Sequence, residues 1–558
     1  MATEGYILFC DVNDGMVHYS VNDVAGRSIS PTMLRRTYRS ARCLNKIERL
    51  NIIRVDLSQR LSASHDLAQF ICKMPNLREL CLGGEYGTTS PSLNGEFYST
   101  LSSLASSAKI ECIEIEYIDL SQRPSASRDL AQFICKMPNL RELHLGDEYG
   151  TTSPSLHEEF YSTLSSLAPS AKIERLDIKY IDLSQRLFAS RDLAQFICKM
   201  PNLREFCLGN ENGITSPSLH EEFCSTLSSL APSAKIERLD IICVDLSQRL
   251  SASRDLAQFI CKMPNLRELL LGDESGYTSH SLHEEFYSTL SSLALSAKIE
   301  TLHHKENLIE RPSASRDLAQ FICKMNNLKN LTLAGWYHDD FYSTLSSMAS
   351  TAKDECNTSS TVKDLTVFNR TLEGWQDCGS MFDSVKRFTI EVRRTIRCDV
   401  IQRIHLPAVT ELTIQTHEYA RWPASLYGDP TSLPNTLLQV SSHLVKVTFR
   451  DLNIGNDQAE CIIQAFRSTH DIKQLRILGF IRCGTDESFD SSCIDSNDEH
   501  KITVEIVHGK PVGYFNSKFG GKEQTTFIEF DKTVQVYWVS CDNNTATILV
   551  AAMTHSDV

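Results

Sequence analysis

Short hydrophobic hexads recur along the chain at a nearly constant spacing. Each follows the pattern L-x-x-L-x-L, in which isoleucine can replace leucine, and this pattern predicts a short strand whose leucines face a core. Consecutive hexads are separated by alternating steps of 30 and 33 residues over most of the run. The hexads start at Ile47, Leu77, Ile110, Leu140, Ile173, Leu203, Ile236, Leu266, Ile299 and Leu328. Phe206 replaces the second leucine of one copy, and His304 replaces the third leucine of another.

Each longer repeat contains two hexads and two helices. The phrase DLAQFICKM begins at Asp66, Asp129, Asp192, Asp255 and Asp317, at spacings of 63, 63, 63 and 62 residues. Its apolar stripe predicts a helix over 66–73, with Ser64 as the N-cap and Pro75 just after the end. A second stripe predicts a helix over 96–104. We name the part with DLAQFICKM and its hexad the A half, and the part with the second helix and its hexad the B half.

One helix and one strand cannot bury their apolar faces alone, whereas stacked repeats can. Neighbouring strands lie about 4.8 Å apart and packed helices about 8–10 Å apart. A stack with one helix per strand must therefore bend, with its strands on the concave side. The sequence predicts an α/β leucine-rich-repeat solenoid with a parallel concave sheet, outer helices and a small β-rich C-terminal cap.

We expect four segments along the chain. Residues 1–46 form an N-terminal cap with a helix from Pro31 to Leu44, and residues 47–355 form the regular repeats. Residues 356–500 form degenerate repeats, and residues 501–558 form the β-rich cap. Strands are expected at 362–367, 385–390, 409–414, 444–449, 472–477, 502–507, 526–530 and 534–540, with a helix over 457–467 and a polar loop over 484–500.

Positions 2, 3 and 5 of each hexad point away from the core. At position 2 acidic and basic residues alternate without a break from Glu48 to Lys329, and such a charge ladder fixes strand register. Position 5 changes between copies while the helices stay almost constant, and the loops after the A-half strands vary and carry aromatic residues. Such residues suit protein recognition, the alternative being drift at unconstrained surface positions. The candidate binding residues are Asn51, Glu114, His144, Asp177, Asp240, Leu270 and His303 at position 5, and Tyr86, Tyr149, Tyr277 and Trp336 in the loops.

Composition and charge narrow the class of protein. The chain has 56 lysines and arginines against 70 acidic residues, a net charge of −14, which argues against a general nucleic-acid binder. No apolar stretch reaches the ~18 residues of a membrane span, and no basic segment of a secretory signal precedes the first apolar run. Five of the 19 cysteines occupy one slot of the A-half helix, where they are expected to be buried thiols of a reducing cytosol.

No motif for catalysis or for metal binding is present in the sequence. Gly520-Gly521-Lys522-Glu523 lacks the spacing and the hydroxyl of a phosphate-binding loop. The run HEEFY at His157 has no second histidine four residues on, and it indicates a solvated helix start with acids near its N-terminus. No Cys-x-x-Cys occurs. We therefore expect no enzymatic activity, no cofactor and no metal.

The alternation of RDLAQFICKMPNLRELHL with HEEFYSTLSSLAPSAKIERLDI resembles the leucine-rich repeats of NACHT-containing NOD-like receptors, in their expanded invertebrate branch. The resemblance covers residues 40–480. It implies a ribonuclease-inhibitor-like horseshoe and a role in innate-immune sensing. In that family a nucleotide-binding NACHT module drives oligomerisation and a death-fold domain signals. Neither module can be placed in this sequence, so ATP binding and self-assembly are not carried over.

These observations favour a cytosolic, non-enzymatic scaffold that binds a protein or microbial ligand on its concave face. It would be the ligand-sensing arm of a NOD-like receptor or a fragment of one, and a NACHT module could be encoded in the full-length gene. The alternatives are a ribonuclease-inhibitor-like protein that binds and regulates an enzyme, and a leucine-rich-repeat substrate adaptor. Neither nucleic acid nor a membrane is an expected partner.

Overall fold

The structure is a computed structural model with two compact units, Met1–Glu300 (unit 1) and Thr301–Val558 (unit 2). Their boundary lies inside the segment that was expected to hold the regular repeats. The described residues are 7–13, 16–22, 48–52, 58–59, 61–83, 93–116, 118–146, 154–179, 181–209, 217–272, 282–354, 361–375, 379–417, 424–428, 430–467, 472, 474–478, 481–482, 501–508, 524–530, 534–542 and 545–552.

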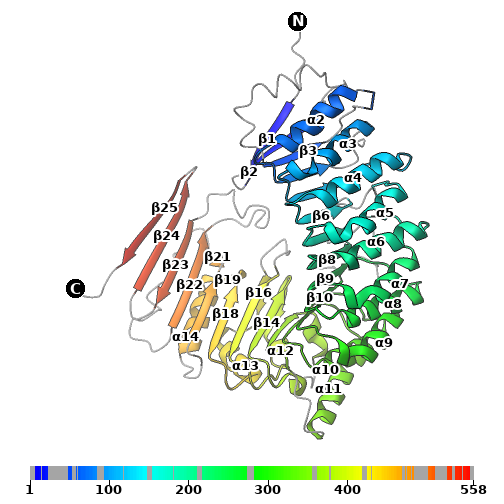
Figure 1. Ribbon diagram of the computed structural model, residues 1–558. Helices are drawn as coiled ribbons and strands as arrows, with labels where there is room; N and C mark the ends of the chain where they lie inside the picture. The colour runs from blue at the N-terminus through cyan, green and yellow to red at the C-terminus, as the bar shows by residue number, and fades with distance from the viewer. Residues whose placement is uncertain are drawn as a thin grey trace. The chain divides into compact units, whose positions relative to one another are not determined.

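Unit 1 alternates outer helices with short inner strands (Figure 1). The A-half helices are α2 (Leu61–Lys73), α4 (Pro124–Lys136), α6 (Leu187–Lys199) and α8 (Leu250–Lys262). The B-half helices are α3 (Gly95–Leu104), α5 (Glu158–Leu167), α7 (Glu221–Leu230) and α9 (Glu284–Leu293). The strands are β3 (Arg49–Ile52), β4 (Glu79–Leu82), β5 (Cys112–Ile115), β6 (Glu142–Leu145), β7 (Arg175–Ile178), β8 (Glu205–Gly209), β9 (Arg238–Ile242) and β10 (Glu268–Leu271). Short 3₁₀ turns follow the B-half helices at Ala105–Ser107, Ala168–Ser170, Ala231–Ser233 and Ala294–Ser296.

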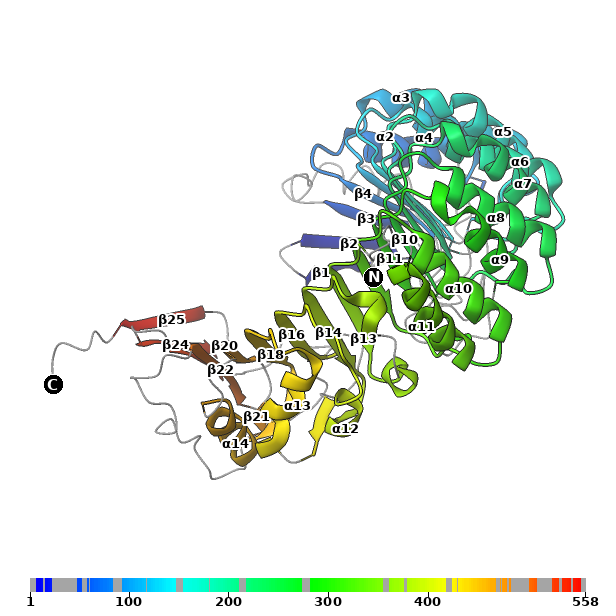
Figure 2. The same cartoon turned by 90° about the horizontal axis from the view of Figure 1, so that it is seen from below.

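The eight strands β3–β10 pair in parallel, each with the next along the chain. The rotated view shows the helices as a layer outside these strands (Figure 2). In every pair, equal hexad positions face each other, as Leu143 faces Leu176. The predicted leucine-rich-repeat solenoid with an inner parallel sheet and outer helices is confirmed, and its register aligns each hexad position into one row.

The hexad leucines and the helix stripes together form the core of unit 1. Leu140, Leu143 and Leu145 of one hexad are completely buried, as are Leu130 and Phe133 of the helix before it. Because each strand and helix buries its apolar side only against its neighbours, the core extends from repeat to repeat.

The A-half helices begin earlier than the sequence predicted, and Ser64 is not an N-cap. α2 starts at Leu61, which places Ser64 inside the helix, and α4 starts with Pro124 at its first position. The equivalent Ser127 is buried, and its hydroxyl donates to the carbonyl of Leu120 at 3.3 Å and accepts from the backbone N–H of His157 at 3.2 Å. This serine therefore connects one helix to the next instead of capping its own.

The histidine of the HEEFY run is itself the N-cap of the B-half helix. Nδ1 of His157 accepts the backbone N–H of Glu159 at 3.2 Å, and Nδ1 of His220 accepts that of Glu222 at 3.1 Å. Asn94 does the same in α3 through its side-chain oxygen, at 3.1 Å from the N–H of Glu96. The run was expected to be a solvated helix start, and a capping role accounts for its recurrence.

The N-terminal segment of unit 1 contains two strands. β1 (Ile7–Asn13) and β2 (Met16–Asn22) pair antiparallel, and β2 continues the sheet by pairing in parallel with β3. The helix expected from Pro31 to Leu44 lies outside the described residues.

Unit 2 begins with one more repeat of the same kind and continues with shorter ones. It contains α10 (Pro312–Lys324), α11 (Asp339–Asp354), α12 (Cys398–Ile401), α13 (Leu433–Val440) and α14 (Asn456–Arg467). Its main parallel ladder consists of β11 (Thr301–His304), β12 (Asn330–Leu333), β13 (Asp364–Phe368), β14 (Arg387–Val392), β16 (Glu411–Thr416), β18 (Lys446–Arg450), β20 (Gln474–Leu478) and β22 (Lys501–His508). The five strands and the helix expected in the degenerate repeats are all present, within two residues at each end.

A second, shorter parallel ladder in unit 2 was not predicted. It consists of β15 (Thr395–Arg397), β17 (Ala424–Tyr427), β19 (Leu452–Gly455) and β21 (Ile481–Arg482). Each of these strands has four residues or fewer and lies outside the hexads that mark the inner strands, so no repeated pattern in the sequence predicts it. Short 3₁₀ turns lie at Thr371–Gly374, Gly379–Phe382 and Pro430–Ser432.

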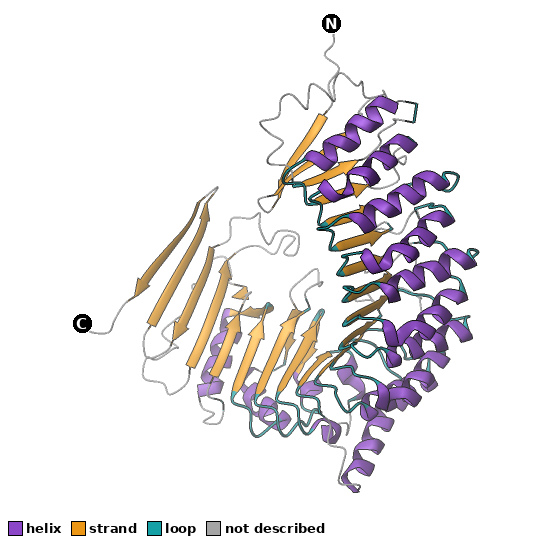
Figure 3. Cartoon of the chain, viewed as in Figure 1, coloured by secondary structure: helices purple, strands orange, loops and turns teal. Residues whose placement is uncertain are grey.

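The β-rich character expected after residue 501 is confirmed. After β22 the chain forms β23 (Gln524–Phe530), β24 (Val534–Asp542) and β25 (Thr545–Ala552), all paired antiparallel in sequence order. The cartoon coloured by secondary structure shows these strands without covering helices (Figure 3). The last strand, β25, was not predicted, and the polar loop expected over 484–500 lies outside the described residues. No helix among the described ranges combines the length and apolar character that a membrane span requires.

Candidate functional site

The register of unit 1 brings six of the candidate residues into one row on the strand face. We call this row of hexad position 5 the position-5 stripe. It runs Asn51, Cys81, Glu114, His144, Asp177, Cys207, Asp240 and Leu270, each facing the next across a strand pair. Position 3 forms a parallel row two residues away, which runs Arg49, Glu79, Cys112, Glu142, Arg175, Glu205, Arg238 and Glu268.

The other candidate residues are not part of this row. His303 lies on β11 of unit 2, where it faces Thr332 of β12. Trp336 is 41% exposed, and the guanidinium of Arg370 lies 4.8 Å from its ring centre. Tyr337 beside it is buried, and its hydroxyl oxygen lies 3.0 Å from Nδ1 of His304. Tyr86, Tyr149 and Tyr277 lie outside the described residues.

Arginines at position 3 hold the acids of the position-5 stripe. Arg175 donates to both carboxylate oxygens of Asp177, each at 3.1 Å. Arg238 donates from Nε to both oxygens of Asp240 at 3.2 Å. The two residues of each pair are two apart on one strand, so their side chains share a face. Each of these carboxylates is therefore held in place by an arginine of its own strand.

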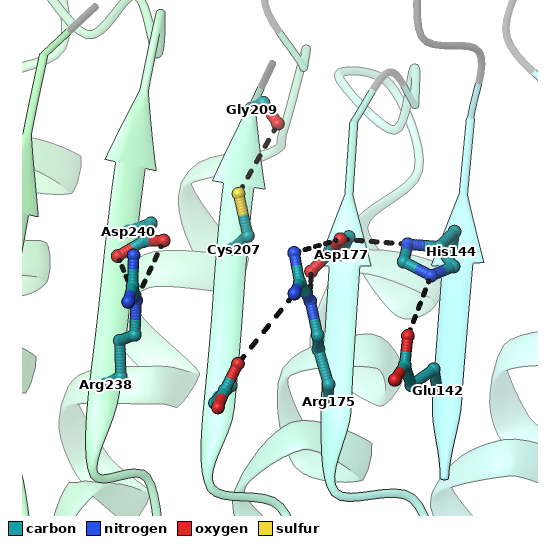
Figure 4. A network of polar contacts seen from close by, with 9 residues as sticks. Glu142, His144, Arg175, Asp177, Cys207, Gly209, Arg238 and Asp240 are labelled. Atoms are coloured by element: carbon teal, nitrogen blue, oxygen red, sulfur yellow. Dashed lines mark hydrogen bonds and ion pairs between the residues drawn. The ribbon is translucent and has the colours of Figure 1, made fainter. Parts of the chain in front are cut away.

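A three-residue network joins two neighbouring strands at the centre of the stripe (Figure 4). Nδ1 of His144 lies 2.8 Å from Oδ2 of Asp177, whose other oxygen is held by Arg175. Burial raises the pKa of Asp177, but the close contact with His144 and the hydrogen bonds from Arg175 outweigh burial and leave the pKa below its ordinary value. Asp177 is thus a fixed negative charge that orients one nitrogen of the imidazole.

The position-5 stripe is less accessible than position 3. The side chains of Asp177 and His144 are 5% and 12% exposed, whereas those of Arg175 and Glu205 are 46% and 51% exposed. Leu270 is also buried, and it packs with Ile242 and Cys243. Sequence reasoning placed the variable stripe at the surface because both positions point away from the core. It did not identify position 3 as the more exposed row, since that depends on side chains folding over their neighbours.

Position 2 forms the charge ladder that the sequence predicted. Arg78 lies 3.9 Å from Glu111 and Arg141 lies 3.8 Å from Glu174, and the same contact joins Arg204 to Glu237 and Arg267 to Glu300. The arginines are more than 60% exposed. Each exposed ion pair of this kind adds little stability. The ladder therefore mainly fixes the strand register and sets the charge of the surface.

The strand face of unit 1 carries a net negative charge. Positions 2, 3 and 5 from Glu48 to Glu300 hold twelve acidic side chains against seven arginines, a net charge of −5 with histidine neutral. Phosphate backbones bind to a basic surface, whereas the charges of this face sum to a negative value. This face favours a partner with a neutral or basic surface.

The strand face also carries cysteine thiols, which the sequence analysis did not propose as site residues. Cys112 occupies position 3, where the other B-half hexads of unit 1 have Arg49, Arg175 and Arg238. Among the described residues, two groups of side chains could hold a metal ion: Cys112 with Glu114 and His144, and Cys81 with Glu114 and Glu116. The signal that could have found them was the replacement of an otherwise constant arginine by cysteine.

Comparisons with known proteins give structural similarity without a family. No family model matches the chain, and no curated protein matches it. The chain is similar to a crystal structure of a protein from Bacteroides fragilis, with 13% identity and a TM-score of 0.25, over 61% of this chain and 72% of that one. It is also similar to TLR13 in a complex with ssRNA13, with 11% identity and a TM-score of 0.22, over 80% of this chain and 73% of that one.

Proposed function

We propose that the chain is a non-enzymatic binding scaffold that holds a protein partner with a basic surface on the strand face of unit 1. The observation that carries this proposal is the net charge of −5 on a face whose position-2 and position-3 side chains are half-exposed. An acidic surface of this kind steers a basic partner into contact and fixes its orientation. The helix sequences are nearly identical from repeat to repeat, whereas the residues of the position-5 stripe differ. This contrast is consistent with a scaffold in which only the strand face varies.

The proposal is tested by comparing two charge-reversal variants of the full chain. In the strand-face variant, Glu205→Lys and Glu237→Lys each remove an acid that contacts an arginine, Arg175 and Arg204. In the matched helix-face variant, Glu159→Lys and Glu285→Lys remove acids that contact Arg128 and Arg254. Both variants change the net charge equally and each breaks two ion pairs, so they differ only in the face that is altered.

Each biotinylated chain is used as bait in a cell lysate at low and at moderate salt, and the captured proteins are quantified by mass spectrometry. We expect a set of basic proteins that the wild type and the helix-face variant retain, that the strand-face variant loses at least about tenfold, and that salt weakens. Equal capture by both variants, or equal loss in both, would contradict the proposed binding face. An enzyme dominating the retained set would instead favour the regulator of an enzyme.

We further propose that this scaffold is the ligand-sensing arm of a NOD-like innate-immune receptor and works in the cytosol. The support is the resemblance of its alternating halves to the repeats of that receptor family. The A-half cysteines are also free thiols, buried in Cys72, Cys135, Cys198 and Cys261 and partly buried in Cys323, and free thiols are typical of a reducing compartment. Sequencing the surrounding gene tests the assignment: a NACHT-coding segment in the same transcript is the expected result, and a transcript that encodes only the repeats would contradict it.

A further inference from the structure

We propose that Cys112, Glu114 and His144 form a binding site for a thiophilic divalent cation such as Zn²⁺ on the strand face of unit 1. One ligand atom from each of these side chains lies within 4.8 Å of the others. Cys112 and Glu114 are two apart on β5, and Glu114 faces His144 on β6. No metal motif is present in the sequence because the register of two strands, rather than a short spacing, brings these residues together.

The set of donor atoms decides the type of cation. A thiolate, an imidazole and a carboxylate are the ligands that Zn²⁺ takes, whereas Ca²⁺ and Mg²⁺ prefer oxygen alone. A tetrahedral ion with bonds of about 2.0–2.3 Å holds its ligand atoms roughly 3.5 Å apart. Since their ligand atoms lie within 4.8 Å of one another, the three side chains need to approach by at most about 1.3 Å. Glu142, which faces Cys112 and has Oε2 at 3.7 Å from Nε2 of His144, is placed to complete the coordination.

Neighbouring side chains already orient two of the proposed ligands. Asp177 contacts Nδ1 of His144 at 2.8 Å, which leaves Nε2 for the ion. Arg49 donates to Oε2 of Glu114 at 3.0 Å, which leaves the other oxygen for the ion. A carboxylate behind a ligating histidine and a hydrogen bond to a ligating carboxylate are regular features of protein metal sites.

The repeats themselves show what distinguishes this strand pair from its copies. At the position of Cys112, β7 and β9 have Arg175 and Arg238, whose guanidinium groups hold the acid two residues on. A guanidinium in this position cannot ligate a cation. In β5 the thiol replaces that arginine, and the acid beside it is held by Arg49 from another strand. Cys112→Arg therefore restores a pattern that already folds twice in unit 1.

The second group, Cys81 with Glu114 and Glu116, is the less suitable site. It contains no imidazole, and Cys81 is buried. Burial raises the pKa of both thiols, Cys81 and Cys112. Glu114, Glu142 and Glu79 raise the pKa of Cys112 further despite the nearby Arg49. Both thiols are therefore protonated before an ion binds. A divalent ion would displace this proton as it binds.

The test titrates the purified full chain with Co²⁺, which reports thiolate ligation by a charge-transfer band in the near ultraviolet. We expect one Co²⁺ per chain with this band, and we expect Zn²⁺ to displace it. Cys112→Arg should abolish the band, whereas Cys207→Ser, which removes a thiol from the same face, should leave it unchanged. Asp177→Asn should keep the band but weaken binding about 10–100-fold, as loss of an orienting partner does.

A wild-type chain without the band, or a band that survives in Cys112→Arg, would overturn the assignment. Loss of the band in Cys81→Ser but not in Cys112→Arg would also overturn it, by moving the site to the neighbouring group. Circular dichroism of each variant shows whether it is folded. This inference goes beyond the proposed scaffold function and is independent of it, because the metal titration contains no protein partner.

Discussion

At the scale of single residues, His304 shows how a polar group enters the core of this fold. It occupies hexad position 6, where every other hexad buries leucine or isoleucine, and it is fully buried beside Tyr337. Burial, and then the charge of Arg311, lower the pKa of His304 to about 3. Burial also lowers the pKa of His417, another buried residue of unit 2, to about 3. The native state therefore keeps both histidines neutral.

Unit 2 is expected to lose stability as the pH falls below the ordinary histidine value of about 6.5. The folded pKa is lower than the unfolded one, so the stabilisation is complete above pH 6.5 and is lost as the pH falls towards 3. Each such histidine contributes a slope of about 1.4 kcal/mol per pH unit in the free energy of unfolding. His304→Leu should remove one such slope and leave that of His417.

Tryptophan fluorescence can follow this effect in unit 2 alone, because all four tryptophans lie after Thr301. Urea unfolding is measured between pH 4 and pH 7 for the wild type and for His304→Leu. Leucine is the residue that the A-half hexads have at this position, so the variant is expected to fold. Parallel pH profiles of the two proteins would contradict the buried neutral histidine.

The candidate site was only partly predictable at this scale. The hexad pattern places Glu114, His144 and Asp177 in one row, because the leucines fix which residues face outward. The pattern could not show that Arg175 covers Asp177 or that Cys112 lies near His144. The first contact joins residues two apart on one strand, and the second joins residues of two neighbouring strands. Both depend on side-chain conformation as well as on register.

At the scale of elements, the B-half helices α5, α7 and α9 begin at an unusual N-cap residue, a histidine. The backbone N–H of Glu222 donates to Nδ1 of His220 at 3.1 Å, where serine, threonine, aspartate or asparagine is the common acceptor. The existence and length of these helices followed from their apolar stripe. The cap was missed, as was the early start of the A-half helices, because helix ends depend on single hydrogen bonds that leave no periodic signal.

Removing this cap is expected to destabilise the first turn of α7. His220→Ala should cost about 0.5–2 kcal/mol, while His220→Asn should be nearly neutral because Asn94 caps α3 in the same way. The backbone contact from His220 to Ser190 remains in both variants. Hydrogen exchange of the peptide 217–230, measured by mass spectrometry, should accelerate in the alanine variant only. Equal exchange in the two variants would show that the imidazole does not cap the helix.

At the scale of the whole molecule, near-identical repeats explain why the fold class was predictable from the sequence. Each half buries its apolar face against the next, and the same hydrogen bonds recur, such as Arg123 to the carbonyl of Leu93 and Arg186 to that of Leu156. Stability in such a stack is approximately a sum of repeats and their interfaces. The division at Glu300 was not predictable, because the hexads continue across it with the same spacing.

Deletion of one whole repeat tests this modular stability. Removing Pro124–Arg186 joins Arg123 to Leu187, so α6 replaces α4 and β8 becomes the neighbour of β5. The A and B halves still alternate, so each helix packs against a neighbour of the same type as in the intact unit 1. We expect a folded chain whose far-ultraviolet dichroism per residue is unchanged. Its total urea m-value should be lower, because less surface becomes exposed on unfolding.

The matched control removes only Pro124–Leu156 and joins Arg123 to His157, which places two B halves side by side. This shorter deletion removes Ser127, which accepts the N–H of His157, and Leu156, whose carbonyl accepts from Arg186. The N–H of His157 and the guanidinium of Arg186 then lose these partners at the new interface, and each such loss costs about 1–3 kcal/mol. The shorter deletion should therefore unfold at lower urea than the longer one. The reverse order of stability would mean that alternation of the two halves does not govern the stack.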